Sequence, residues 1–369
     1  MQIWRINLSQ IPIDIKELPV VELKGDFQTM GEQFGEASRT QINELYEIRL
    51  EAALNHAKDR GREYSVDQAL AIASENLSIL KEFDEEIYEE TLGIAEGANL
   101  SLAQIFILQG LTDFRDFLSW GKISEGVGCT ALSISPEKSA TNQLLMAQNW
   151  DLGTSNMPYV CMVSRFPNSG PSTYSLTVYG GLCMVALNSE GIAVGTTNIK
   201  TTDTRPGVHY LNILHKAMKA KTIKEAEKSI INAPRAGAHF YMIGDSKGNF
   251  NGIECSALKH AYMSKENGVL SHCNHILDKD LKPLEAEDMG PSTCQRQKRV
   301  DQLLKRESFS ISDIKEILSD HDGGELAICR HDVGEGISTN GSVIIEPQNM
   351  TIHACRSYPN EGNWKKFSF

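Results

Sequence analysis

The chain has 369 residues, of which 41% are hydrophobic and 23% are charged, and its formal net charge is -12 at pH 7. This composition is typical of a globular protein with a large core, and the negative charge argues against nucleic acid or an anionic membrane as a partner. No uninterrupted apolar run approaches the roughly 18 to 20 residues of a membrane span. Residues 1–20 carry charges where a signal peptide would be apolar, so we expect a cytoplasmic protein.

The first third of the sequence predicts helices. Residues 1–25 are expected to be extended, and from Phe27 to Ala52 apolar residues recur at helical spacing. Gly31 and Gly35 lie inside this pattern, which predicts close packing against another element. Further helices are expected from Ser65, over residues 83–97 and from Ser101 to Leu118. Residues 121–128 are expected to form a loop.

The pattern changes at Cys129, where short strands begin. Leu132 and Ile134 alternate with serines, and a polar turn leads to a second apolar run, which predicts a hairpin with Cys129 on its first strand. Further strands are expected at 159–166, 174–179, 184–187, 192–196, 240–243, 250–254, 342–345 and 351–355. Helices are expected at 210–220, from 222, at 295–305 and at 314–318. Hairpins rather than strand–helix–strand units predict antiparallel sheets, and hence an α/β fold of the layered αββα type after a helical segment of residues 1–128.

Eight cysteines are scattered through the last two thirds of the chain, and none forms a Cys-x-x-Cys pair. The spacing therefore indicates neither a structural zinc site nor a redox motif. Most of these cysteines are expected to be small buried hydrophobic residues. Cys129 differs because it stands in the block Gly128-Cys129-Thr130-Ala131, with a polar block at residues 148–151 behind it.

Five blocks together resemble the acyl-coenzyme A:6-aminopenicillanic acid acyltransferase family, also called isopenicillin N acyltransferase-like. They occur in order over residues 20–355, nearly the whole chain. The blocks are Glu22–Gly25 with Met30-Gly31 and Phe34-Gly35, then Gly128–Ala131, Gln148–Asp151, Ser271–His275, and Ile328–His331 with Thr339–Ile345.

The resemblance implies an N-terminal nucleophile hydrolase fold and a precursor that cuts itself before the cysteine. Residues 1–128 would then be a pro-segment that becomes the small subunit, and residues 129–369 the catalytic subunit. The implied substrate is a small amide, with an acyl-thioester donor as an alternative. The cleaved N-terminal subunit would stay as a partner, a homo-oligomer is left open, and no cofactor or metal is implied.

The expected nucleophile is Cys129, and cleavage is expected between Gly128 and Cys129. Once Cys129 begins a chain, its α-amino group, with a reference pKa of about 7.7–8.0, can serve as the base for the thiol. Gly128 suits cleavage because glycine tolerates strained backbone and exposes its carbonyl. The alternative is a buried cysteine on a strand led by a glycine.

Three further residues complete the predicted catalytic set. Asp151 is expected to hold the new α-amino group, with Asn149 as a lesser candidate; the alternative for Asp151 is a turn-forming residue. Asn274 matches the family's oxyanion-hole asparagine, whose amide would donate to the oxyanion. The competing interpretation of His272-x-x-His275 is a metal pair, which has only two ligands at that spacing.

Arg330 is expected to fix a carboxylate of the substrate or of the site. Its alternative is a surface ion pair, and Arg296 with Arg299 could compete for the same role. Their spacing of three puts both on one helix face, which is more often a solvated face.

Ala131 stands where the penicillin enzyme of the family has a second threonine, which argues for a different amide. Hydrolysis of a small N-acyl amide is therefore the favoured function, with acyl transfer to a small amine as the alternative. A catalytically inactive binding protein of the same fold is a third hypothesis.

Overall fold

The computed structural model describes residues 15–119, 128–286, 290–332 and 336–369. The predicted loop at 121–127 and most of the predicted extended N-terminus lie outside these ranges. Gly128, which was assigned to that loop, is the first residue of strand β2, Gly128–Ile134. The bond between Gly128 and Cys129 therefore lies inside a strand. The division of the chain into two subunits at this bond stays a prediction.

The described residues before β2 are mainly helical, as predicted, apart from strand β1, Val20–Gly25. The helices are α1 Phe27–Ala37, α2 Arg39–Asp59, α3 Val66–Phe83, α4 Glu85–Ala98 and α5 Leu102–Ser119. The helical pattern of residues 27–52 does not form one helix, because the backbone leaves the helical region at Ser38, with φ -126° and ψ 21°. The helix predicted from Ser65 is present as α3, and a capping box between Ser65 and Gln68 starts it.

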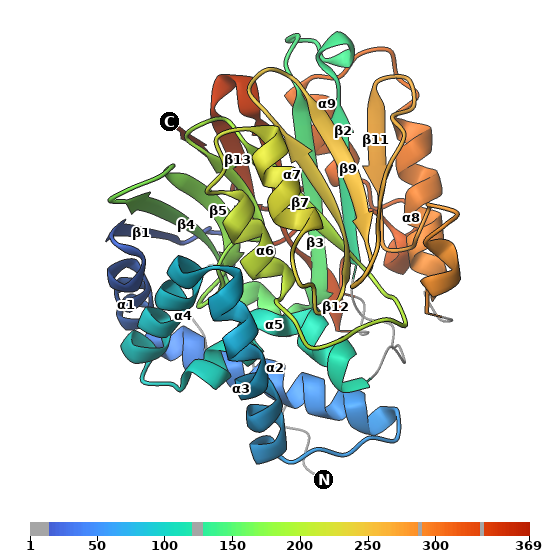
Figure 1. The fold of residues 1–369 in the computed structure, drawn as a ribbon. Coiled ribbons are helices and arrows are strands. Elements are labelled where there is room, and N and C mark those ends of the chain that lie inside the picture. Colours follow the sequence, from blue (N-terminus) through green and yellow to red (C-terminus); the bar gives the residue numbers. More distant parts are fainter. Residues whose placement is uncertain (1–14, 120–127, 287–289, 333–335) are drawn as a thin grey trace.

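Glycines bring α1 and α4 into direct backbone contact, which confirms the close packing predicted for Gly31 and Gly35. A Cβ on Gly31 would lie 2.2 Å from the backbone oxygen of Glu90, and one on Gly93 would lie 2.2 Å from that of Gln28. The two helices lie side by side at the edge of the molecule (Figure 1). No side chain fits between them at these positions.

Gly31→Ala is therefore expected to lower the free energy of unfolding by about 1–3 kcal/mol, because the added methyl group must push two helix backbones apart. This loss exceeds the gain of up to about 1 kcal/mol in helix propensity. Thermal or denaturant unfolding measures the change. Gly153→Ala is the control, since the nearest atom to its added Cβ is 3.6 Å away; equal losses in the two variants would contradict the packing argument.

Two sheets form the centre of the molecule. The larger has eight strands in the order β1-β4-β5-β6-β7-β8-β9-β10, and the smaller has six in the order β11-β2-β3-β12-β13-β14. The remaining strands are β3 Leu145–Gly153, β4 Val160–Pro167, β5 Thr173–Val178, β6 Val185–Asn188, β7 Ala193–Ile199, β8 Ala238–Gly244, β9 Phe250–Cys255, β10 His260–Tyr262, β11 Val269–His272, β12 Ile337–Glu346, β13 Thr351–Arg356 and β14 Lys365–Ser368. All pairings between these named strands are antiparallel, as predicted, except that β1 pairs in parallel with β4.

The two sheets face each other, with β2 and β3 of the smaller sheet against β7 of the larger. Helices α6 Tyr210–Ala217 and α7 Ile223–Ile231 cover the larger sheet, and α8 Gly290–Leu303 and α9 Ile311–Leu318 cover the smaller one (Figure 1). The predicted αββα sandwich is confirmed. Helices α1 to α5 close one end of it, and α5 contacts both α2 and α6.

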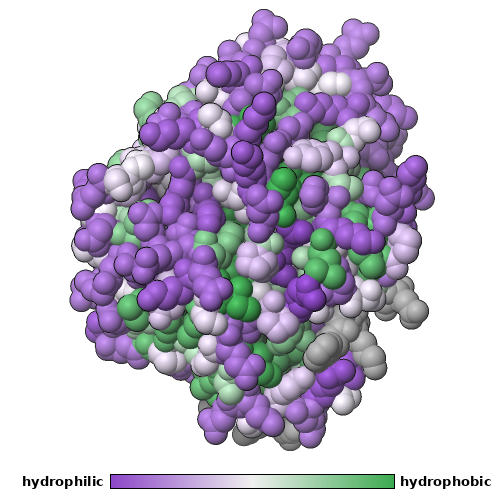
Figure 2. Space-filling view, in the orientation of Figure 1, coloured by the Kyte–Doolittle hydropathy of each residue, from purple (hydrophilic) through white to green (hydrophobic). Residues whose placement is uncertain are grey.

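The face seen in Figure 2 is mostly hydrophilic, and its hydrophobic residues gather mainly in the lower half, over the N-terminal helices. Among the described residues no single helix is long and apolar enough to cross a membrane, although the bent pair of α4 and α5, at 113°, meets the criterion by length and composition alone.

Candidate active site

The expected nucleophile lies on the buried strand β2. Cys129 is only 3% exposed and pairs with Trp150 of β3, while Gly128 pairs with Asp151. The hairpin between β2 and β3 therefore returns Asp151 to the predicted cleavage site. This adjacency follows from the strand register, since residues directly opposite on neighbouring antiparallel strands lie about 5 Å apart.

Asp151 packs against Gly128 itself. A Cβ on Gly128 would lie 2.7 Å from Asp151 Oδ2, so only glycine leaves room for this carboxylate. Gly128 does not have a positive φ, so the structure shows no left-handed backbone strain at this glycine, contrary to the prediction. Glycine is required here by the close approach of a carboxylate.

The Asp151 carboxylate is buried and only half satisfied. Its Oδ1 accepts a hydrogen bond of 2.7 Å from Thr339 Oγ1, whose oxygen in turn accepts one of 2.9 Å from the backbone N–H of Arg330. Oδ2 is buried and has no hydrogen-bond partner among the residues that the structure describes. Burial raises the pKa of Asp151 above its ordinary value, and the charges of Arg296 and Arg330 oppose this rise.

Asn274 contacts Cys129, but not through the group that was expected. Its Oδ1 accepts a hydrogen bond of 2.8 Å from the backbone N–H of Cys129, and its Nδ2 donates one of 2.8 Å to the backbone oxygen of Asn198. In the uncleaved chain Asn274 therefore holds the nitrogen of the predicted scissile bond. Its role as an oxyanion donor stays a prediction for the cleaved form.

Arg296 of α8, which the sequence analysis named only as a competitor for the role of Arg330, contacts Cys129 directly. It is 1% exposed, donates from Nη1 to the backbone oxygen of Cys129, and donates from Nη2 to Asn274 Oδ1 at 2.7 Å. The solvated face suggested for Arg296 and Arg299 is therefore wrong for Arg296. Arg299 instead pairs with Asp320, at 3.0 Å from Nε to Oδ2.

The sequence of α8 contains a pattern that is consistent with a buried Arg296. The buried residues of this helix follow one face at helical spacing, and three of the four are polar: Thr293, Arg296, Gln297 and Val300. A polar stripe of this kind can face either solvent or a polar site. Sequence alone did not separate the two cases.

Arg330 lies close enough to Asp151 for its charge to lower the pKa of that carboxyl group, and it is 6% exposed. A surface ion pair, the alternative for Arg330, does not fit this burial. Asn149 is turned away from the cleavage site, because its Nδ2 donates to the backbone oxygens of Leu318 and Ile328.

The thiol of Cys129 is not activated in the uncleaved chain. Burial raises its pKa to about 12, the charge of Asp151 adds to the rise, and the charge of Arg296 opposes it. At neutral pH the thiol is therefore protonated. A small pocket next to it has room for about one water molecule. Its lining consists of Thr112, Cys129, Trp150, Met184, Thr196, Asn198, Tyr210 and His239.

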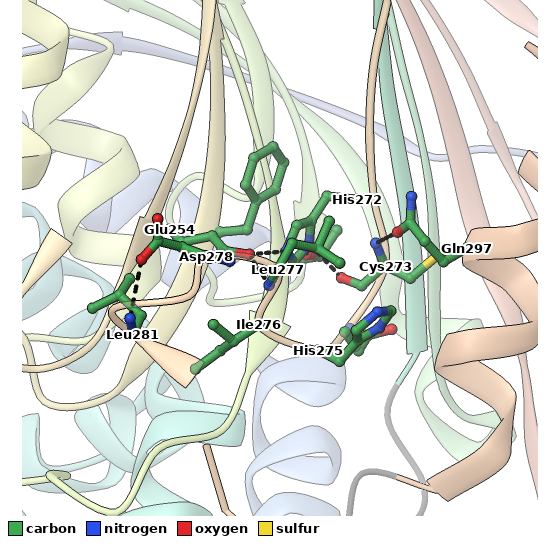
Figure 3. A network of polar contacts seen from close by, with 12 residues as sticks. Glu254, His272, Cys273, His275, Ile276, Leu277, Asp278, Leu281 and Gln297 are labelled. Atoms are coloured by element: carbon green, nitrogen blue, oxygen red, sulfur yellow. Dashed lines mark hydrogen bonds and ion pairs between the residues drawn. The ribbon is translucent and has the colours of Figure 1, made fainter. Parts of the chain in front are cut away.

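A buried network holds the segment that carries Asn274 (Figure 3). His272 Nε2 lies 2.9 Å from Glu254 Oε1, and the same carboxylate accepts hydrogen bonds from the backbone N–H groups of Leu277 and Asp278. Cys273 N donates to Gln297 of α8 at 2.9 Å. The loop after β11 is thus fixed on both sides of Asn274.

The two histidines suggested as a metal pair have separate partners. His272 Nδ1 lies 2.6 Å from Thr197 Oγ1, whereas His275 Nδ1 lies 2.8 Å from Thr293 Oγ1. Among the described residues no group of three or more metal-ligating side chains occurs.

An αββα sandwich with its candidate cysteine at the start of an inner strand is the architecture of an N-terminal nucleophile hydrolase. Residues 138–361 match the model of the acyl-coenzyme A:6-aminopenicillanic acid acyl-transferase family, which is more than half of the chain. The chain belongs to this family. The resemblance seen in the sequence blocks is thereby confirmed.

One relative is the 40 kDa form of acyl-coenzyme A:6-aminopenicillanic-acid-acyltransferase from Emericella nidulans, which is 26% identical over 319 residues, or 84% of each chain. Among solved structures, a mutant of conjugated bile acid hydrolase from Clostridium perfringens is 12% identical, with a TM-score of 0.41 over 65% of this chain and 97% of its own. Penicillin V acylase from Agrobacterium tumefaciens is 12% identical, with a TM-score of 0.43 over 65% and 86%. The family assignment rests on the sequence match.

Proposed function

We propose that this chain is a self-processing cysteine amidohydrolase that cleaves a small N-acyl amide through a thioester on Cys129. The observation that carries the proposal is the setting of the Gly128–Cys129 bond. Its nitrogen is held by Asn274, and a buried, half-satisfied carboxylate lies against Gly128. A carboxylate that could act as a base and an amide oxygen that accepts from the N–H of the same peptide bond support this proposal.

In the self-cleavage step, Sγ of Cys129 attacks the carbonyl carbon of Gly128. The thiol proton passes to Asp151, whose raised pKa makes it a stronger base than an ordinary aspartate, and then to the departing nitrogen of Cys129. The C–N bond breaks as the thioester forms. This step frees the α-amino group of Cys129. Water then hydrolyses the thioester, which releases the Gly128 carboxylate and the thiol.

The new α-amino group would supply the donor that Asp151 Oδ2 lacks. An unpaired buried carboxylate oxygen is costly, and an ammonium group beside it removes that cost. The deprotonated amine can then take the thiol proton when Cys129 attacks a substrate carbonyl. Arg296, through the carbonyl of Cys129, keeps the nucleophile's backbone in place.

Acyl transfer to an amine is the second candidate, and it is favoured by the family of the chain and by the name of its Emericella relative. Both reactions share one acyl-enzyme and differ in whether water or an amine attacks it. Processed protein should be incubated with N-acyl amides of varied acyl length, with and without a competing small amine. Free acid as the main product in both cases supports hydrolysis, whereas dominance of the new amide would assign transfer.

A further inference from the structure

The pocket beside Cys129 is built from both parts of the chain. Thr112 comes from α5 of the pro-segment, whereas Asn198 and His239 come from β7 and β8 of the larger sheet. All three are at least nine-tenths buried, with exposed fractions of 3%, 5% and 2%. Neither His239 nor Thr112 has a role in the self-cleavage chemistry described above.

The orientation of His239 is fixed from the pro-segment. Its Nε2 lies 2.9 Å from Oδ1 of Asp113 on α5, and Asp113 Oδ2 accepts a hydrogen bond of 2.7 Å from the backbone N–H of Tyr210. The ring of Tyr210 stacks on the imidazole, with centroids 4.3 Å apart. Because a carboxylate only accepts, Nε2 carries the ring proton.

Nδ1 of a neutral His239 is then an acceptor without a donor. The nearest hydroxyl, Thr196 Oγ1 at 3.4 Å, donates its proton to the backbone oxygen of Phe240 at 2.8 Å. Two further pocket atoms, Thr112 Oγ1 and Asn198 Oδ1, are buried and have no hydrogen-bond partner among the described residues. Two unfilled acceptors, His239 Nδ1 and Asn198 Oδ1, and a hydroxyl without a partner, that of Thr112, therefore gather next to the thiol.

Two special backbone features occur at the contact between Asp113 and His239. Leu111 has φ 35° and ψ -103°, which breaks α5 directly before Thr112 and Asp113. A Cβ on Gly237, just before β8, would lie 2.4 Å from Asp113 Oδ1, so a side chain there would displace the carboxylate. The backbone conformation of Leu111 is costly for a residue with a side chain. Such conformations persist where the surrounding structure imposes them, and they cluster at functional sites.

We propose that His239, held by Asp113, recognises the substrate by accepting a hydrogen bond from an amide N–H beside the carbonyl that Cys129 attacks. The preferred substrates are then primary and secondary amides rather than tertiary amides or esters. Asp113 is a positioning residue, so the pro-segment remains part of the recognition site after cleavage. This inference rests on the proposed function.

The test uses two alkylating probes on the processed protein, 2-chloroacetamide and N,N-dimethyl-2-chloroacetamide. With both, the sulfur of Cys129 displaces chloride and its proton goes to the α-amino group, but only the first probe carries N–H donors. Labelling rates of Cys129 by mass spectrometry are divided by the rates with free cysteine. Wild type should react with 2-chloroacetamide roughly tenfold or more faster than with the N,N-dimethyl probe, because the dimethyl probe leaves the buried Nδ1 of His239 without a donor.

Asp113→Asn should remove this preference. The oxygen of the substituted side chain must accept from the backbone N–H of Tyr210, because that group can only donate. The NH2 group of the same side chain then faces Nε2 of His239 and donates to it, so the ring proton moves to Nδ1, which can no longer accept. His239→Gln, which keeps a donor toward Asp113 but lacks Nδ1, should lose the preference as well. His215→Gln is the matched control, because His215 is also buried, with 4% of it exposed, and contacts Glu90 of the pro-segment at 2.8 Å, but does not line this pocket.

A wild-type protein that labels equally with both probes would overturn the inference and leave the proposed function standing. The same holds if both variants keep the wild-type preference, or if His215→Gln loses it too. Failure of both probes to label Cys129 would contradict the proposed function and this inference with it, whereas labelling by 2-chloroacetamide alone is the extreme of the expected preference.

Discussion

Asp151→Asn is expected to remove most of the activity and, at the same time, to stabilise the uncleaved chain. Asparagine keeps an oxygen for Thr339 but has no charge for the α-ammonium group and cannot accept the thiol proton. Loss of a general base typically costs about 10²–10⁴-fold in rate. Self-cleavage of the purified precursor, followed by intact mass against time, should slow by at least roughly hundredfold.

Asp151→Asn is expected to raise stability although it lowers activity, because burial disfavours the charged form of Asp151 and so raises its pKa. Between the ordinary aspartate pKa of about 3.9 and this raised value, the folded chain binds more protons than the unfolded chain, so stability falls as pH rises through that window. Cys129→Ala and the double variant Cys129→Ala/Asp151→Asn, both uncleaved, should be compared by denaturant unfolding. The double variant should be more stable at pH 7, and its advantage should shrink in acid; a less stable double variant would contradict the buried unpaired charge.

Arg296→Met is expected to slow self-cleavage by roughly hundredfold or more. The guanidinium group donates to the backbone oxygen of Cys129 and to Asn274 Oδ1. Its removal takes this donor from the buried Cys129 oxygen, leaves Asn274 Oδ1 with the Cys129 N–H alone, and leaves the nucleophile's peptide plane less firmly held. Arg296→Lys should restore only part of the rate, because an ammonium group cannot reproduce the fork of a guanidinium group. Cleavage rate and melting temperature should be measured on the same samples.

Arg299→Met is the matched control for Arg296. It lies on the same helix and is also an arginine, but its partners are Asp320 and Asp322 and its side chain is 32% exposed. Exposed ion pairs contribute about 0–1 kcal/mol, so this variant should cleave at the wild-type rate. Equal slowing in the two arginine variants would mean that α8 acts only as a structural support.

Local patterns of the sequence predicted the elements near the site well. The hairpin of β2 and β3 followed from alternating apolar residues and a polar turn, and its register accounts for Asp151 lying opposite Gly128. The close approach of α1 and α4 followed from glycines spaced four apart. In each case the feature depends on residues that are near in sequence or on one periodic face.

Features that depend on distant contacts were missed. The parallel pairing of β1 with β4 joins segments far apart in the chain, and no local pattern marks it. Whether the polar face of α8 meets solvent or Cys129 is decided by where the helix packs. Asp113 and His239 are 126 positions apart, and the break at Leu111, directly after Gly110, falls inside a segment predicted as one continuous helix.

Intact-mass measurement of the purified wild-type protein beside Cys129→Ala tests the central claim most directly. The account predicts two fragments for wild type, one ending at Gly128 and one beginning with a free Cys129, and a single chain for the variant. Cys183→Ala, in which another buried free cysteine is removed, should be cleaved like wild type. A wild-type chain that stays whole while it hydrolyses amides would contradict the account.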